Sequence, residues 1–228
     1  AASAVDPRIR TADVLTMDIA HEPNRAALVG AIRTEPLVAE VAASWPNDIA
    51  GRPAFADAGR GRQAVTYEFA SREYFDVLGI PVVKGRGFLP SERASSAVAI
   101  VSARVAGQLW PNADAVGQVL RLGVDPDRST PSEPSGPALP PTVVVVGVTR
   151  DVPGFRLGGL RIAGAGVYLP TDAGTAGTSL TIRVHDDPAS ARRALVDRRT
   201  TIEPGLVADQ ISLLRDVAAM EAYLLGIP

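Results

Sequence analysis

Hydrophobic and polar positions alternate in several segments of the chain, and this period-two pattern predicts β-strands. Residues 63–70 are the clearest case, because Val65, Tyr67 and Phe69 fall on one face. The same pattern, or a short apolar run, predicts further strands at 12–20, 38–45, 98–101, 116–122, 143–149, 180–185 and 210–214. The polar segment 51–61, which has a glycine at each end, is expected to be a loop.

Apolar residues three or four positions apart predict helices between these strands. The expected helices lie within residues 23–35, 71–78, 103–110, 187–202 and 217–225. The helix within 71–78 places Tyr74, Phe75 and Leu78 on one face, and Gly79 is its C-terminal stop. This mixture of strands and helices predicts an α+β fold.

The order of the elements divides the chain into three blocks. The first and third blocks share a strand–helix–strand order, which forms a weak internal repeat around an inserted middle block. Within the middle block, two strands flank residues 125–141, a segment rich in Pro, Ser, Asp and Gly. This composition predicts a hairpin with an enlarged tip. A tip of this length is either functional or disordered, and the sequence leaves both readings open.

Composition narrows the classes of function. The 228 residues carry a formal net charge of −2, which argues against a nucleic-acid-binding protein. The absence of cysteine excludes disulfides, thiolate metal sites and cysteine nucleophiles. No apolar run approaches the roughly 20 residues that cross a bilayer, and the first residues do not resemble a signal peptide. The abrupt ends lead us to expect a segment of a longer protein.

Nucleotide-binding motifs are absent from the sequence. There is no Gly-x-x-x-x-Gly-Lys-Ser/Thr loop, and Lys84, the only lysine, lies outside any such context. The run Gly85-Arg86-Gly87 begins like a dinucleotide-binding fingerprint, but Pro90 stands where the third glycine is needed. We therefore interpret this run as a turn at the end of a strand.

No catalytic or metal-binding residue is predicted. His21 and His185 lack metal-ligand spacing, and we interpret residues 185–187 as a solvated turn and helix N-terminus. Trp45 and Trp110 are expected to pack in the core. No Gly-x-Ser-x-Gly elbow marks a serine hydrolase, whereas a pair of carboxylates distant in the chain stays open. The chain is therefore not expected to be an enzyme, and no cofactor is predicted.

Seven short motifs follow one another along most of the chain, most clearly from 65 to 152. They are Tyr74-Phe75 with Leu78-Gly79-Ile80, Gly85-Arg86-Gly87-Phe88, Glu92, Val98-Ala99-Ile100-Val101, residues 110–118, residues 144–148 with Asp151-Val152, and Tyr168-Leu169-Pro170. In this order they resemble the periplasmic core domain of MacB/FtsX-type ABC transporter permeases. Ser102 departs from the family, which usually has Asn there.

The resemblance implies an architecture as well as a family. It implies two porter-like α/β lobes, formed by residues 11–70 and 178–228, with a smaller Sabre-like α/β lobe inserted at 71–177. Ala12 and Gly226 are then expected at the same pole of the domain. The residues that the resemblance marks as structural are Tyr74, Phe75, Leu78, Gly79, Gly85, Arg86, Phe88, Trp110, Gly117, Gly147, Asp151 and Pro170.

The resemblance also implies a function. The chain would be the extracytoplasmic domain of an inner-membrane permease, relaying ATP-driven movement to the export or extraction of a substrate outside that membrane. Its partners would be a second permease protomer, reached through membrane helices, a fused or separate ABC ATPase, and a periplasmic adaptor or lipoprotein. Two other classes stay open: a free-standing periplasmic binding or adaptor module, and a hydrolase with a dispersed site.

Overall fold

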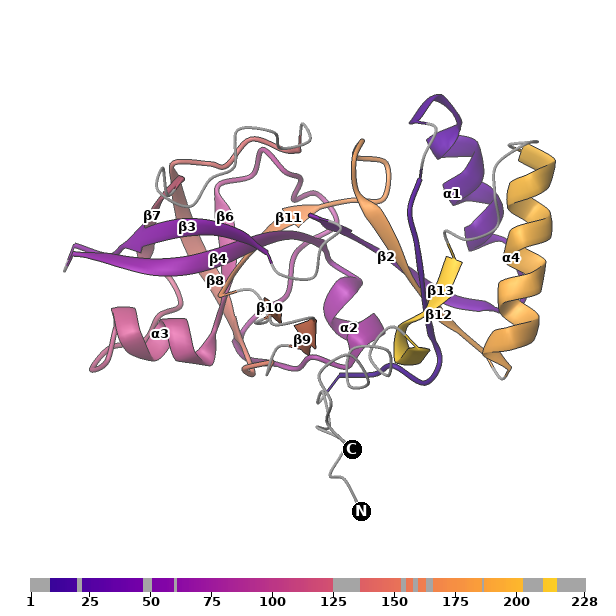
Figure 1. Cartoon of the computed structure of the whole chain (residues 1–228). Coiled ribbons are helices and arrows are strands. Elements are labelled where there is room, and N and C mark those ends of the chain that lie inside the picture. Colours follow the sequence, from indigo (N-terminus) through magenta and orange to yellow (C-terminus); the bar gives the residue numbers. More distant parts are fainter. Residues whose placement is uncertain are drawn as a thin grey trace, which may run out of the picture.

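Paired β-strands from every part of the chain form the framework of the protein (Figure 1). The computed structural model describes residues 9–19, 22–46, 51–59, 61–124, 136–152, 155–157, 160–162, 166–185, 187–202 and 211–216. Within these residues, eleven strands join one continuous sheet, and two more form a small separate hairpin. That hairpin consists of β9 (Phe155–Leu157) and β10 (Leu160–Ile162).

Six strands of the sheet close on themselves to form a barrel. They are β3 (Arg52–Asp57), β4 (Arg62–Ser71), β6 (Val98–Ser102), β7 (Val119–Val124), β8 (Thr142–Thr149) and β11 (Val167–Thr171). The pairing runs β4–β3–β7–β8–β6–β11, and β11 pairs again with β4. Alternate residues such as Val65, Tyr67 and Phe69 are buried in one cluster with residues from all six strands. A closed ring of this kind leaves none of its strands as a bare edge.

Two shorter elements accompany the barrel. The helix α3 (Ala103–Leu109) packs against β6 and β8, and its Val105 and Leu109 join the barrel core. The strand β5 (Val82–Gly85) pairs with the last residues of β8, on the side opposite β6.

The rest of the sheet is covered by two helices on one face. The antiparallel strands lie in the order β2 (Val38–Trp45), β12 (Ser179–Val184), β1 (Val14–Met17) and β13 (Ile211–Leu213). The helices α1 (Arg25–Arg33), which follows the short helix η1 (Glu22–Asn24), and α4 (Pro188–Ile202) lie side by side over them. Leu28 and Ile32 of α1 and Leu195 of α4 are fully buried against the strands. We call this part the helix-covered sheet.

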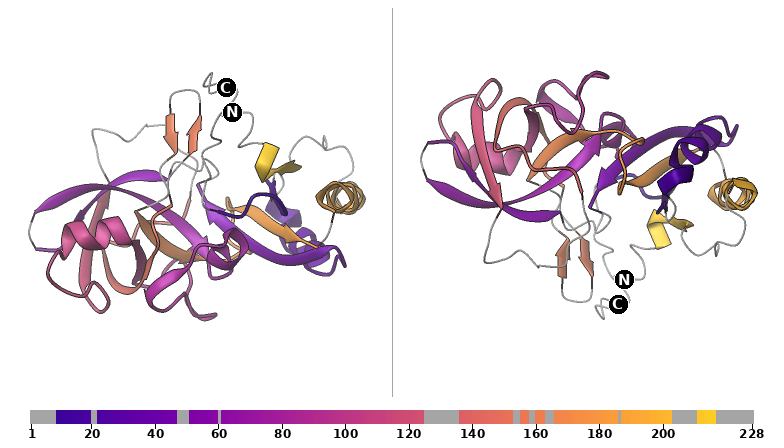
Figure 2. Two further views of the ribbon diagram at one scale, coloured as in Figure 1. Left: turned by 90° about the horizontal axis from the view of Figure 1, so that it is seen from below. Right: turned by 90° about the horizontal axis from the view of Figure 1, so that it is seen from above.

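The strand β4 connects the two parts (Figure 2). Its first residues pair with β3 in the barrel, while Phe69 and Ala70 pair with Trp45 and Ser44 of β2. The short helix α2 (Tyr74–Leu78) follows β4 directly and lies between the barrel and the helix-covered sheet. The junction is therefore built from one continuous strand and the helix that ends it.

Most predicted elements are present. The strand at 38–45, the helix at 187–202 and the hairpin made by β7 and β8 are confirmed, and Gly79 ends α2 in the left-handed conformation. Both tryptophans, Trp45 and Trp110, are core residues as expected. The helix expected at 217–225, most of the 125–141 tip, and Gly226 lie outside the described residues.

The loop expected at 51–61 is wrong, because residues 52–57 form β3. Ala54 and Ala56 face the barrel core, where small side chains fill the space. Because the inward positions hold no large apolar residue, the sequence of this segment resembles that of a polar loop. The β9–β10 hairpin was not predicted either. Among the described residues, no helix is both long and apolar enough to cross a membrane.

Candidate functional site

Four aromatic side chains form the centre of the junction between the barrel and the helix-covered sheet. Phe75 lies between Phe88 and Tyr168, with ring centroids 6.0 and 5.1 Å away, and Tyr74 stacks edge-on against Phe75 at 5.8 Å. All four are buried, in one cluster that also contains Val14 of β1 and Ile100 of the barrel strand β6. Both parts of the fold therefore pack against the same aromatic cluster.

A buried carboxylate sits within this aromatic cluster. Glu68 on β4 is only 5% exposed, and it lies directly opposite Tyr168 in the β4–β11 register. The Tyr74 hydroxyl hydrogen-bonds to Glu68. Burial, and next the negative charge of Glu68, raise the pKa values of Tyr74 and Tyr168 well above the ordinary range. Both phenols therefore keep their protons, and the Tyr74 O–H can donate a hydrogen bond to the Glu68 carboxylate.

Two glycines of the predicted motif face each other across β5 and β8. Gly85 pairs with Gly147, and Gly85 has φ +68°, a left-handed conformation that favours glycine. A Cβ at Gly85 would collide with the Val146 carbonyl oxygen, and one at Gly147 would collide with the Arg86 carbonyl oxygen. The glycines are needed because the two backbones approach too closely for any side chain.

An ion pair closes the turn that follows Gly85. Arg86 donates from Nη1 and Nη2 to the two carboxylate oxygens of Glu92, at 3.0 and 2.8 Å. Glu92 also accepts the Leu89 backbone N–H at 2.7 Å. The hydrogen bond from Arg86 is the main cause that holds the pKa of Glu92 below its ordinary value. This pairing explains why an arginine and an acidic residue occur together in the motif. Phe88, which lies in the same turn, packs in the aromatic cluster.

The remaining motif residues hold α3 and the strand ends. Ser102 caps α3, because its Oγ accepts the Val105 N–H, so it fills the N-cap position for which Asn is equally suited. Asp151 accepts the Arg104 N–H at 2.8 Å at the same helix end. Trp110 ends α3 and Gly117 follows with φ +85°.

Two further motif residues lie at the junction. Leu78 is buried in the aromatic cluster beside Gly79, and Pro170 lies in β11 opposite Ala70 of β4. The motif residues are therefore split between the junction and the part of the barrel against which α3 packs.

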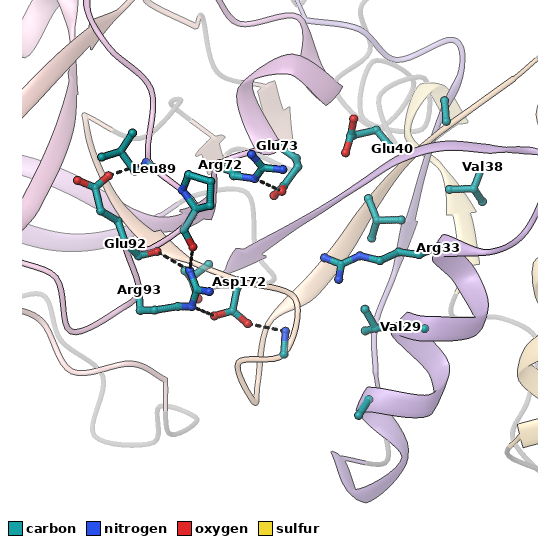
Figure 3. Close-up of a pocket in the computed structure, with 17 residues that line it drawn as sticks. Val29, Arg33, Val38, Glu40, Arg72, Glu73, Leu89, Glu92, Arg93 and Asp172 are labelled. Atoms are coloured by element: carbon teal, nitrogen blue, oxygen red, sulfur yellow. Dashed lines mark hydrogen bonds and ion pairs between the residues drawn. The ribbon is translucent and has the colours of Figure 1, made fainter.

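A cleft of about 750 Å³ opens beside this junction (Figure 3). Its lining comes from α1, from the first half of β2, from the turn between β4 and α2, from the segment after Phe88, and from the end of β11. The charged residues of the lining are Arg33, Glu40, Arg72, Glu73, Glu92, Arg93 and Asp172. Arg33 and Asp172, which are 139 positions apart in the sequence, thus line the same surface. No local spacing in the sequence predicts this cleft.

Ion pairs join the walls of the cleft. Arg93 lies 3.2 Å from Asp172 and thereby links the segment after β5 to the turn after β11. Asp172 also accepts the Gly174 N–H at 2.8 Å, which fixes its orientation. Arg72 pairs with the adjacent Glu73 at 2.6 Å.

Two charged side chains of the cleft have no such partner. Arg33 on α1 and Glu40 on β2 make no hydrogen bond or ion pair within the described residues. Both side chains point toward the open space of the cleft (Figure 3).

Of the two histidines, His185 is the one that lies within the described residues. His185 lies just before α4, where Asp187 caps the helix by accepting the Ala189 and Ser190 N–H groups, as expected of a helix N-terminus. His21 lies outside the described residues. Within the described part of the chain, no group of three His, Cys, Asp or Glu residues could hold a metal ion.

Comparison with known proteins agrees with this architecture. A family model described as the MacB-like periplasmic core domain matches residues 3–199. The search of curated proteins gives no match. The periplasmic region of MacB from Actinobacillus actinomycetemcomitans superposes with a TM-score of 0.62 at 13% identity, over 93% of this chain and 94% of that chain.

Two other solved structures share the fold. A domain of a protein named as a permease from Porphyromonas gingivalis gives a TM-score of 0.52 at 16% identity, over 86% of this chain and 87% of that chain. The extracellular domain of the noncanonic ABC-type transporter YknZ from Gram-positive bacteria gives 0.51 at 19% identity, over 82% and 93%.

Proposed function

Because this chain belongs to the family of MacB-like periplasmic core domains, we propose that it is the extracytoplasmic domain of an inner-membrane ABC permease and relays ATP-driven movement to a substrate outside that membrane. Permeases of this family dimerise and work with ATPase partners. In this proposal the second protomer is reached through membrane helices, a fused or separate ATPase supplies the energy, and an adaptor or lipoprotein is the partner outside the membrane. The domain itself catalyses no reaction.

The observation that carries the relay is the sharing of β4 by both parts of the fold. The strand β4 pairs with β3 and β11 in the barrel and with β2 in the helix-covered sheet. A displacement of one part is transmitted to the other because the protein interior is densely packed and deforms little. A tilt of the helix-covered sheet would therefore move the barrel with it, with the aromatic cluster as the contact under load.

We assign the lobes accordingly. Residues 11–70 and 178–228 would form the porter-like lobe pair, and residues 71–177 would form the inserted Sabre-like lobe. The helix-covered sheet, with strands from both ends of the chain, supports the first assignment, and the barrel strands β6, β7, β8 and β11 support the second. The strands β3 and β4 fall within residues 11–70 but pair into the barrel, so in this proposal the first porter-like segment also contributes two strands to the barrel.

The first test of this function is where the domain lies in the cell. In cells that make the parent protein, the domain should remain with the membrane fraction and should be cleaved by protease added outside intact spheroplasts. Cleavage only after lysis would refute the extracytoplasmic assignment. Recovery in the soluble periplasmic fraction would instead support a free-standing binding or adaptor module.

Coupling is tested in the full-length permease with its ATPase in lipid nanodiscs. Phe75→Leu removes the ring that packs between Phe88 and Tyr168 and so loosens the contact between the two parts. We expect this variant to lower ATP turnover, whereas Val119→Ala, at an exposed position on β7 away from the junction, should leave turnover unchanged. Equal turnover in all three proteins would argue against a relay through this junction.

A further inference from the structure

The cleft contains an open strand edge. The strand β2 pairs with β12 from Val38 to Ser44, but within the described residues β4 pairs with β2 only at Ser44 and Trp45. The strand β4 ends at Ser71 and the chain turns into α2. The two strands therefore separate like a fork, and among the described residues no strand pairs with the first half of β2 on the side that faces the cleft.

The hydrogen-bonding direction of β2 follows from its register. The Ala43 N–H points toward β4, because Ser71 Oγ accepts it at 3.0 Å. Successive residues of a strand alternate their hydrogen-bonding groups between its two sides, so the N–H and C=O of Val41 also point into the fork. Four residues of β2 line the cleft, namely Val38, Ala39, Glu40 and Val41. A bare edge of this kind is a template for one more extended strand.

Other features of the cleft favour an occupant. Thr171, which is 4% exposed and lines the cleft, has an Oγ1 without a hydrogen-bond partner among the described residues. Gly30 lies inside α1 and lines the cleft, although a Cβ there would meet nothing within 4 Å. A glycine inside a helix lowers helix stability relative to alanine, and packing does not require it here. Its effect is to widen the cleft beside the open edge.

The charges indicate what the occupant carries. Arg33 and Glu40 point into the cleft from α1 and β2 without partners among the described residues, while the other charged groups on the rim are already paired. A strand laid along β2 would expose its side chains to both. Charge-assisted hydrogen bonds would then select an acidic residue for Arg33 and a basic residue for Glu40.

We propose that this cleft binds an extended peptide segment of a partner protein, which adds a strand to the open edge of β2 in the line that β4 leaves at Ser71. The segment pairs through its backbone with Val41 and carries one acidic and one basic side chain, for Arg33 and Glu40. This inference concerns binding by the 228-residue chain alone, so it holds or fails independently of the transport role.

The test is a selection of eight-residue peptides from a random phage-displayed library against the 228-residue chain. Enriched peptides should contain an acidic and a basic residue, and they should lose binding in synthetic form when the backbone nitrogens are methylated one at a time at the pairing positions. No enrichment, or binding insensitive to every N-methylation, would overturn strand addition. The second result would indicate a side-chain or small-molecule pocket.

Variants at two positions place the site. Gly30→Trp should fill the cleft and abolish binding, while Gly30→Ala, whose Cβ meets no atom within 4 Å, should bind as the wild type does. Arg33→Glu should weaken binding about tenfold or more, and selection against this variant should exchange the acidic residue for a basic one. Arg121→Glu, an exposed position on β7 away from the cleft, is the matched control and should have no effect.

This comparison requires that the Gly30→Trp and Arg33→Glu variants remain folded. Thermal melting should show Gly30→Trp and Arg33→Glu within a few degrees of the wild type, since both positions point to open space or solvent. If a folded Gly30→Trp chain still binds the enriched peptides with unchanged affinity, the peptides bind elsewhere and the proposal is wrong.

Discussion

Replacement of Arg25 should destabilise the domain more than replacement of any exposed arginine. Arg25 begins α1 and is only 4% exposed. Its guanidinium donates to the carbonyl oxygens of Ala173 and Thr178, at 3.0 and 2.8 Å, and to the Thr178 hydroxyl at 3.0 Å. It also pairs with both carboxylate oxygens of Glu22, at 2.6 and 2.9 Å. One side chain thus joins α1 to the turn between β11 and β12.

The magnitude follows from the groups that Arg25→Met would leave behind. The apolar stem would be replaced by one of similar volume, but two buried carbonyl oxygens would lose their donor. An unsatisfied buried acceptor costs about 1–3 kcal/mol, so the two together cost about 4 kcal/mol of unfolding free energy. Glu22 is 39% exposed, so solvent screens it and its lost pairing adds little. For a domain of this size, the melting temperature should fall by about 8–16 °C.

The assay is thermal and urea unfolding followed by circular dichroism. Arg33→Met on the same helix is the control, because Arg33 is exposed and its replacement should change the free energy by no more than about 0.5 kcal/mol. Arg25→Lys should lie between the two, since an ammonium group cannot reach all of these acceptors. A loss below about 1 kcal/mol for Arg25→Met would refute the assignment of this arginine as the joint between α1 and the turn.

Two further predictions concern the motif turn after β5. Gly85→Ala should cost at least about 2 kcal/mol in urea unfolding, because its φ is positive and its Cβ would meet the Val146 carbonyl, whereas Gly87→Ala should be nearly neutral; equal losses would contradict the close-approach argument. Arg86 lowers the pKa of Glu92 below its ordinary 4.5, so the stabilisation is present above that pH and is lost as the pH falls through the lowered pKa. The stability difference between wild type and Glu92→Gln should therefore shrink below pH 4.5, and a difference that stays constant would exclude this ion pair as the cause.

Local sequence patterns predicted the elements whose neighbours along the chain decide their structure. The strand 38–45 and the helix 187–202 follow from periodicity and from terminal residues such as Pro188, which is tolerated in a first helical turn. The strand β3 was missed because its inward positions hold alanine, and alanine lacks the β-branched or aromatic signal of a strand. Packing within the barrel, which selects small residues there, is invisible from the local sequence.

The candidate site shows the same limit in a stronger form. The motif residues Gly85, Arg86 and Phe88 were predictable as a turn, but the pairing of Gly85 with Gly147 depends on strands that are distant in the chain. The cleft could not be predicted, since Arg33 and Asp172 line the same cleft only when β4 pairs with β11 and the sheet is complete. The open edge of β2 has no sequence signature, because it arises from where a different strand ends.

The position of β1 between β12 and β13 determines how the domain responds to force. Leu15 and Leu213 are cross-strand partners, so the two points where the chain enters and leaves this sheet are a single strand spacing apart. A pull on both points in the same direction would shift the sheet as a rigid unit. A pull that separates them would break the hydrogen bonds between β1 and β13 one pair after another, at low force, and would leave the barrel unloaded. The domain is therefore mechanically stiff toward concerted motion and weak toward splitting at its base.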